Sequence, residues 1–373
     1  MRSSLPDFPW DALAPYGDKA RAHPGGIIDL SVGTPVDPTP EFIQTALRDA
    51  SNSPSYPVTA GTPELRAAIT AWAKSRLGAT GDFDVLPVIG SKELVAWLPT
   101  ILESKKVLIP EIAYPTYHVG ALIAQAQSVP VPISAQSWPQ GDLAWMNSPS
   151  NPTGSVYTSA QAKAIAEWAV ANNIWIISDE IYEHLLYDGA TAPSLPVLVP
   201  ALADTCIIIN GVAKTYAMTG WRVGWMIGPK DVIKAATNLQ SHLSSNVSNI
   251  SQRAAIAALT GDLTAVQEMG VAFNRRRKLI VDLINEIPGF VCPVPQGAFY
   301  VYPSVKGVLG KTIRGKTPTT SAELATLILE EVEVAAVPGE AFGPSGYLRF
   351  SYATSDEDIV EGIGRIKKLL TEG

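Results

Sequence analysis

The sequence contains few cysteines, histidines and charges. Its 2 cysteines, Cys206 and Cys292, are far apart, so we expect a reduced cytoplasmic chain without disulfides. The 4 histidines lack the short spacings of metal ligands, and we predict no metal site. No apolar run reaches the roughly 18 residues that a membrane helix needs, and the N-terminus does not resemble a signal peptide. Lysine and arginine number 28 against 35 acidic residues, and this acidic balance argues against a nucleic-acid-binding surface.

What the sequence does contain is apolar. Hydrophobic residues make up 46% of its 373 residues. This composition excludes a disordered chain, and a chain of this length can form a large hydrophobic core. Strands are predicted at residues 85–89, 106–109, 128–133, 144–146, 174–178, 206–209 and 223–227, with helical patterns between most of them. Most of these runs are continuously apolar, which is typical of a parallel sheet with both faces buried. The short link between the last two predicts one antiparallel strand.

After about residue 245 the pattern changes. One long helical stretch is predicted at 246–287, and we expect its basic run at 275–278 (RRRK) to be a solvated helix face. Strand patterns at 298–301, 334–337 and 347–351, and helix patterns at 321–331 and from Asp356, predict a smaller α+β unit. The proline-rich segment before Phe42 is expected to pack on that unit.

Three polar motifs each follow a predicted strand. They are NSPSNPTG (147–154), SDEIY (178–182) and AKTYAMTGWRVG (213–224). Alone, each has a simple structural explanation, such as a turn, a helix cap or a surface lysine. Because open α/β sheets bind ligands at the carboxyl ends of their strands, the three motifs together predict a ligand site.

This combination resembles the class I/II aminotransferases, which are pyridoxal-phosphate (PLP) enzymes of fold type I. Further motifs of that family are GTP (33–35), GTPELR (61–66), GSK (90–92), PEIAYPTY (110–117), QGAFY (296–300), VPGEAFG (337–343) and YLRFS (347–351). The resemblance implies an α/β fold with a mostly parallel seven-stranded sheet between helices. It also implies a large PLP-binding domain at 45–270 and a small domain formed by 1–44 and 271–373.

The resemblance assigns the cofactor residues. Lys214 is expected to form the imine with PLP and then to move the substrate proton, and Asp179 is expected to keep the pyridine nitrogen protonated. Tyr182 and Asn151 are expected to hydrogen-bond the ring 3-oxygen, and Tyr114 to pack on the ring.

The phosphate and the substrate have their own residues in this resemblance. Ser91 and Lys92 begin a predicted helix, whose N-terminus favours an anion, and the phosphate is also assigned to Arg222. Tyr56 resembles a tyrosine contributed by a partner subunit, which implies a homodimer with shared active sites. For substrate binding, Arg349 is expected to bind the α-carboxylate, together with the backbone of Gly33 and with Asn151.

One motif departs from the family pattern. Many relatives have Ser-x-Ser-Lys where this chain has Gly211, Val212, Ala213 and Lys214. Both hydroxyl groups are therefore missing. We expect Ser91, Tyr56 and Arg222 to carry more of the phosphate binding.

The resemblance implies amino transfer between glutamate or 2-oxoglutarate and a second amino or oxo acid. Segments 5–11 and 30–38 are similar to actinobacterial N-succinyldiaminopimelate aminotransferases of lysine biosynthesis, which makes N-succinyl-LL-2,6-diaminopimelate the expected substrate. Another amino acid (aspartate, aromatic or similar) and a PLP-dependent C–S lyase reaction are the alternatives. A PLP-binding regulator of transcription is disfavoured by the acidic charge and by the few residues before Leu5. The absence of GxGxxG disfavours a NAD-binding protein.

Overall fold

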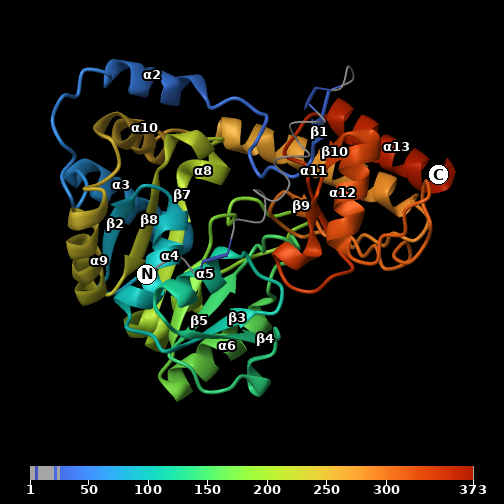
Figure 1. Cartoon of the computed structure of the whole chain (residues 1–373). Helices are drawn as coiled ribbons and strands as arrows, with labels where there is room; N and C mark the ends of the chain where they lie inside the picture. The colour runs from blue at the N-terminus through green and yellow to red at the C-terminus, as the bar shows by residue number, and fades with distance from the viewer. Residues whose placement is uncertain (1–4, 7–20, 23–25, 373) are drawn as a thin grey trace.

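The computed structural model describes residues 5–6, 21–22 and 26–372. A large sheet and its helices form one part of the molecule, and the last helices lie beside it (Figure 1). Within the described residues, no helix is both long and apolar enough to cross a membrane.

The large sheet has seven strands in the order β2-β8-β7-β6-β5-β3-β4. Their bounds are Asp84–Val88 (β2), Lys106–Pro110 (β3), Gln127–Val131 (β4), Leu143–Asn147 (β5), Trp175–Asp179 (β6), Cys206–Gly211 (β7) and Gly224–Gly228 (β8). β8 is antiparallel to both of its neighbours, and the other pairs are parallel. This confirms the predicted fold class, including the single antiparallel strand.

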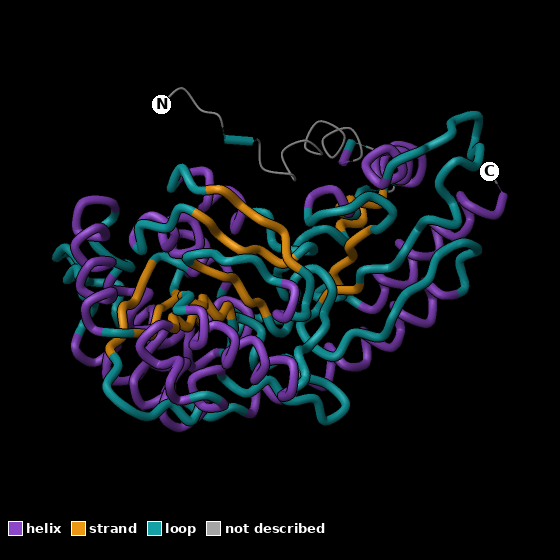
Figure 2. The backbone as a smooth tube through the Cα atoms, turned by 90° about the horizontal axis from the view of Figure 1, so that it is seen from below, coloured by secondary structure: helices purple, strands orange, loops and turns teal. Residues whose placement is uncertain are grey.

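Helices cover both faces of this sheet. One face packs against α4 (Ser91–Ile101), α5 (Thr116–Ile123) and α9 (Lys230–Leu243). The other packs against α3 (Pro63–Trp72), α6 (Ser159–Asn172) and α10 (Asn249–Thr260). The strands therefore run through an interior surrounded by helices (Figure 2). This burial explains why the strand sequences are apolar without alternation.

Local signals set several helix boundaries. Thr158 begins α6 with a capping box, in which its hydroxyl accepts from the backbone of Gln161 and the Gln161 side chain accepts from the Thr158 backbone. Thr320 and Glu323 form the same arrangement at the start of α12 (Ser321–Val332). These caps fix the residue at which each of the two helices begins.

The single helix predicted at 246–287 is wrong. The structure has two helices there, α10 and α11 (Thr264–Asn285), separated at Gly261. A β-carbon at Gly261 would lie 2.5 Å from the ring of Phe42, which belongs to α2 (Glu41–Asp49). The break therefore lets α2 approach closely, a contact that local sequence does not reveal.

The predicted solvated face of the basic run is also wrong for two of its arginines. Arg276 is 8% exposed and its Nη1 lies 2.7 Å from Asp37 Oδ2. Arg277 is 1% exposed, lies 2.6 Å from Asp188 Oδ2 and donates to the carbonyl of Pro295. Buried arginines need such partners, and these partners are remote in sequence.

The C-terminal elements form two small sheets covered by helices. β1 (Ile28–Asp29) pairs in parallel with β10 (Val334–Ala335), so the early strand lies beside the late one (Figure 1). A second sheet has the order β11 (Val337–Pro338), β12 (Leu348–Ser351), β9 (Tyr300–Val301). The strand predicted at 334–337 is thus divided between two sheets. The core beneath them also contains residues of α11, α12 and α13 (Asp356–Glu372).

The pairing of β1 confirms that described residues before Phe42 pack on the C-terminal elements. The domain boundaries at residues 44/45 and 270/271 stay a prediction.

Candidate active site

One cavity of about 460 Å³ collects nearly all the predicted site residues. Its lining includes Gly33, Ser91, Lys92, Tyr114, Asn151, Asp179, Tyr182, Lys214, Arg222 and Arg349. The exception is Tyr56, which does not line it and is 93% exposed. Residues from the ends of β5, β6 and β7 therefore meet in one place, as the strand-end argument predicts.

Lys214 lies in a short helix, α8 (Val212–Thr215), directly after β7. Its Nζ donates a hydrogen bond to the carbonyl of Gly33 at 2.6 Å. Burial, followed by the nearby charges of Arg349 and Arg222, lowers the pKa of Lys214 to about 8, against the opposing effect of Asp179. The amine consequently loses its proton more readily than an ordinary lysine, as a nucleophile or base requires.

Asp179 ends β6 and is held at both carboxylate oxygens. Oδ2 accepts from the Tyr117 hydroxyl at 2.8 Å, and Oδ1 accepts from the backbone N–H of Ile181 at 3.3 Å. Burial raises the pKa of Asp179 to about 6, while these hydrogen bonds and Lys214 act in the opposite direction. A cationic ring nitrogen beside the carboxylate would favour its charged form.

Tyr117 was not predicted as a site residue, although its motif was recognised. Its ring stacks on Trp145 with centroids 4.4 Å apart, which fixes the phenol toward Asp179. Tyr114 precedes α5 and Tyr117 lies in its first turn, and the backbone N–H of Tyr117 donates to the carbonyl of Tyr114 at 3.1 Å. Their rings meet edge to face, 5.8 Å apart.

The N-terminus of α4 and Arg222 form a cradle for an anion. Gly90 precedes α4 with φ +89°, and a β-carbon there would lie 2.3 Å from Arg222 Nη2. Gly224 of β8 also lies close to the start of α4, because a β-carbon there would lie 2.8 Å from the backbone nitrogen of Ser91. Both glycines keep this space free of side chains. Backbone N–H groups at a helix start next to a guanidinium fit a phosphate group.

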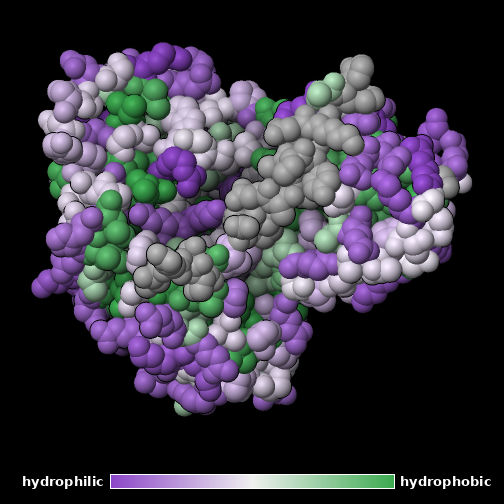
Figure 3. Space-filling model, in the orientation of Figure 1, coloured by the Kyte–Doolittle hydropathy of each residue, from purple (hydrophilic) through white to green (hydrophobic). Residues whose placement is uncertain are grey.

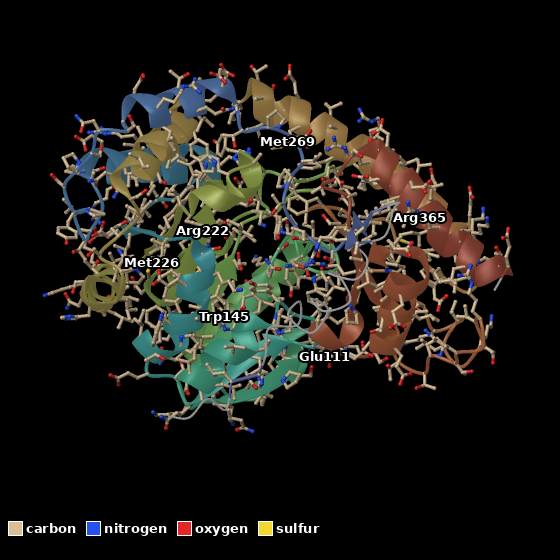
Figure 4. The ribbon with its side chains drawn as sticks, turned by 45° about the horizontal axis from the view of Figure 1, so that its top comes forward. Glu111, Trp145, Arg222, Met226, Met269 and Arg365 are labelled. Atoms are coloured by element: carbon tan, nitrogen blue, oxygen red, sulfur yellow. The ribbon has the colours of Figure 1, made fainter. Side chains whose placement is uncertain are left out.

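Arg222 is oriented by backbone carbonyls, since its Nη1 donates to Thr219 at 2.8 Å. Figure 4 shows Arg222 in the part of the molecule that contains the large sheet. Lys92, on the first turn of α4, also lines the cavity. Four cationic side chains therefore surround one cavity, which makes it a site for anionic ligands.

Arg349 lies on β12 and is 2% exposed. Its Nη1 donates to Asn151 Oδ1 at 2.8 Å, and its Nη2 donates to the carbonyl of Ser31. The guanidinium lies over the ring of Tyr300, 4.3 Å from its centroid. This brings a cation from the C-terminal elements to the sheet, where it can bind a carboxylate.

The segment around Gly33 reaches the site only because residue 33 lacks a side chain. A β-carbon there would lie 1.9 Å from the Tyr300 hydroxyl oxygen. That hydroxyl is also 3.0 Å from the hydroxyl of Tyr182. Tyr300 is thus a second site residue that sequence reasoning missed, although its QGAFY motif was recognised.

Asn147 is the third missed residue. Its Oδ1 accepts from the backbone N–H of Asn151 at 2.8 Å, and its Nδ2 donates to the carbonyl of Asp179 at 3.0 Å. It therefore fixes the loop after β5 to the end of β6. The first asparagine of NSPSNPTG positions the second one.

The missing hydroxyl at position 211 has a steric explanation. A β-carbon at Gly211 would lie 2.8 Å from the carbonyl oxygen of Val223 and 2.9 Å from the α-carbon of Gly224. Strand β8 therefore occupies the space that a serine side chain would need. Nothing in the structure explains the alanine at 213. Among the described residues there is no cluster of metal-binding side chains.

Comparison with known proteins agrees with this geometry. The family model for aminotransferase class I and II matches residues 25–366. A relative named aspartate aminotransferase, from Streptomyces avermitilis, is 52% identical, covering 95% of this chain and 91% of that protein.

Solved structures are similar over almost the whole chain. The aspartate aminotransferase of Rhizobium meliloti has a TM-score of 0.88 and 34% identity, covering 96% of this chain and 95% of that one. The Thermus thermophilus aspartate aminotransferase with maleate has a TM-score of 0.86 and 28% identity, covering 99% and 100%.

Proposed function

This chain belongs to the class I and II aminotransferases, which use pyridoxal phosphate, and from that premise we propose that it moves an amino group between glutamate or 2-oxoglutarate and a second amino or oxo acid. The observation that supports this most strongly is the single cavity lined by Lys214, Asp179 and Arg349. It combines an amine of lowered pKa, a buried carboxylate and a buried guanidinium.

When bound, PLP supplies an aldehyde that condenses with amines and a ring that accepts electrons. The chain supplies the groups around it. Lys214 would hold the aldehyde carbon between turnovers, and Asp179 would keep the ring nitrogen protonated. Tyr182 and Asn151 would donate to the ring 3-oxygen, and Tyr114 would pack on the ring face. Ser91, Lys92 and Arg222 would hold the phosphate.

Proton transfer is the task of Lys214. With cofactor and substrate bound, the free amine of Lys214 would be the base that accepts the proton of the substrate α-carbon and later releases it. The two nearby arginines favour the neutral amine, because a second positive charge beside them is unfavourable. The same cations attract the carboxylates of the substrate.

Arg349 orients the substrate for this step. Its guanidinium binds the α-carboxylate in a bidentate way, with the backbone N–H of Gly33 and the side chain of Asn151 as further donors. Fixing the carboxylate in this way places the α-carbon proton near Lys214.

For the second substrate we propose aspartate first. Relatives from Streptomyces avermitilis and Rhizobium meliloti are named aspartate aminotransferases, and a Thermus thermophilus relative was solved with maleate, a dicarboxylate. Lys92 lines the cavity in addition to Lys214, Arg222 and Arg349. It is the candidate for binding the second carboxylate of aspartate or glutamate.

N-succinyl-LL-2,6-diaminopimelate is a second candidate, which would place the enzyme in lysine biosynthesis. The resemblance of segments 5–11 and 30–38 motivates it. A larger cavity next to the catalytic one supports a longer substrate. A C–S lyase reaction is the remaining alternative, since the cofactor residues do not distinguish it.

We also propose a homodimer with shared active sites. Tyr56 is 93% exposed, and Val58 and Leu243 are 58% and 45% exposed. Apolar residues also gather on the surface around α2, α3 and α4 (Figure 3). Exposed apolar surface of this kind is typical of an interface. In such a dimer Tyr56 would reach the phosphate of the partner subunit's cofactor. The cytoplasmic location stays a prediction.

The test is an assay of purified, PLP-loaded protein with 2-oxoglutarate and a panel of amino acids. We expect glutamate to form in equal amount with the oxo acid of the donor. A Lys214→Ala variant is the control. Release of pyruvate and ammonia from cysteine derivatives without 2-oxoglutarate would instead identify a lyase, and failure of all donors would contradict the proposal.

A further inference from the structure

The catalytic cavity adjoins a second cavity of about 890 Å³, which we call the side groove. The two cavities share Lys92, Tyr114 and Arg222 in their linings. The side groove therefore adjoins the catalytic cavity next to the phosphate cradle, at Lys92, the residue proposed to bind the second carboxylate of the substrate.

The walls of the side groove are mainly apolar. They include Ile89, Ala96, Ile109, Val119, Pro130 and Phe342. The side chains of Ile109 and Phe342 are 7% and 4% exposed, so both are packed in the protein core.

Strands, helices and a turn all contribute to these walls, with Ile109 on β3 and Pro130 on β4. Ala96 lies on α4 and Val119 on α5, and the turn that includes Phe342 belongs to the C-terminal elements. A backbone hydrogen bond of 2.9 Å from Ala113 to the carbonyl of Phe342 fixes that turn against the start of α5. Leu5, from the N-terminal segment, completes the described lining.

The sizes of the two cavities limit what each can hold. Ligand sites of small molecules commonly have about 300–1,000 Å³. The catalytic cavity, at about 460 Å³, must accommodate both the cofactor and the reacting end of the substrate. A substrate side chain much longer than that of aspartate or glutamate therefore has to extend beyond the catalytic cavity. The side groove is the space next to that cavity.

Positive charge is concentrated at the end of the side groove that adjoins the catalytic cavity. Lys92 and Arg222 lie there, and Glu93, Glu111 and Glu340 are the acidic residues of the described lining. Figure 4 shows Glu111 well apart from Arg222, where the sheet meets the C-terminal elements. Burial raises the pKa of Glu93, which favours its neutral form at the apolar wall. An apolar stem thus fits the groove beyond the cationic end.

We propose that, in addition to aspartate, the enzyme accepts amino acids with an extended, unbranched, mainly apolar side chain, and that the side groove binds this side chain. This inference rests on the proposed amino transfer, for which it names the substrate class. A methylene that moves from water to an apolar wall improves binding by up to about fourfold. Because one side of the groove can stay in contact with water, we expect about two- to fourfold per methylene.

The test uses the holoenzyme and the unbranched series from alanine through 2-aminobutanoate, 2-aminopentanoate and 2-aminohexanoate to 2-aminooctanoate. The rate of the first half-reaction is followed by the change in cofactor absorbance at limiting amino acid. We expect kcat/KM to rise about two- to fourfold with each methylene. Aspartate serves as the short reference substrate.

Two variants narrow the groove without touching the residues proposed to bind cofactor or α-carboxylate. In Ala96→Leu and Val119→Phe, we expect the rate with 2-aminooctanoate to fall about tenfold or more, and the rate with aspartate to stay within twofold. Ala164→Leu is the matched control, because Ala164 is exposed on α6, which packs on the opposite face of the sheet. It should change neither rate.

The outcomes separate the inference from the function on which it rests. If neither glutamate nor aspartate changes the cofactor spectrum, the proposed amino transfer itself fails. If they react but the rate does not rise with chain length, or if Ala96→Leu and Val119→Phe slow all substrates equally, the side groove is not a substrate site. A flat length series together with a changed oligomeric mass in these variants would show that a second copy of the chain covers it.

Discussion

The catalytic cavity and the side groove share three residues, but they are built from different parts of the fold. Asp179 ends β6, Asn151 and Lys214 follow the ends of the neighbouring strands β5 and β7, and all three side chains have hydrogen-bond partners. The side groove is lined by helix faces, strand residues and a turn, and its walls are mainly apolar. The proposed reaction type thus depends on strand ends that sequence motifs mark. The proposed choice of a long substrate depends also on helix-face residues outside those motifs, such as Ala96 and Val119.

Loss of Lys214 should have the largest effect, and it should be the same for short and long substrates because Lys214 belongs to the catalytic cavity and not to the side groove. In Lys214→Ala we expect kcat to fall by about 10⁴-fold for every substrate, because both the nucleophile and the proton-transfer base are removed. Stopped-flow measurement of the half-reaction with glutamate and with 2-aminooctanoate checks this. Loss confined to one substrate would contradict a common chemical role.

Arg349→Lys should have the next largest effect. A lysine cannot reproduce the two parallel hydrogen bonds of a guanidinium, so we expect about 100-fold lower kcat/KM for short and long amino acids alike. Steady-state kinetics with aspartate and 2-aminohexanoate measure it. Lys306→Arg, on the exposed surface, is a control of similar chemistry. An effect on only one of the two amino acids would place Arg349 at the side chain instead of the α-carboxylate.

Cofactor uptake should depend on pH through Lys214. Burial lowers its pKa from 10.5 to about 8, so the reactive free amine becomes more abundant as pH rises through 8. We expect the rate at which apoenzyme takes up PLP to rise about tenfold per pH unit below 8 and to level off above it. The absorbance of the bound cofactor reports this rate. A rise that continues to pH 10 would mean that the lysine is not desolvated.

Tyr117→Phe tests a positioning residue of the cavity. Its hydroxyl stabilises the charged form of Asp179, so its loss should raise the pKa of that carboxyl. Activity that needs the carboxylate is lost as pH falls through this pKa, and the acidic limb should therefore move to higher pH. We expect roughly tenfold lower kcat near pH 6 and a smaller loss at pH 8. A uniform loss at all pH values would indicate a purely structural role.

Ser91→Ala should have the smallest effect. With Gly211 and Ala213 replacing the usual serines, we expect Ser91 to carry part of the phosphate binding, and PLP affinity to weaken about fivefold. Fluorescence titration of the apoenzyme measures this. Ser241→Ala, exposed on α9, is the control. Unchanged affinity would show that phosphate binding was not redistributed to Ser91.

The sequence predicted the elements whose signals are local. Apolar runs followed by Asn147, Asp179 and Lys214 marked strands β5, β6 and β7 and their ends, because a buried strand and a polar strand end leave a clear pattern. The start of α6 also has a local signal, because Thr158 and Gln161 have the spacing of a capping box.

What could not be predicted depends on contacts between distant residues. Phe42 explains the break at Gly261, and Asp37 explains the burial of Arg276, but neither partner is near its target in sequence. The side groove is a further case, since Val119 and Phe342 meet around it only in the folded chain.

The most direct measurement of the central claim is to treat the PLP-loaded protein with borohydride and map the modified peptide by mass spectrometry. Our account predicts a single reduced cofactor adduct on Lys214, absent after prior incubation with glutamate. An adduct on Lys92, the other lysine of the cavity, or no adduct at all, would contradict it.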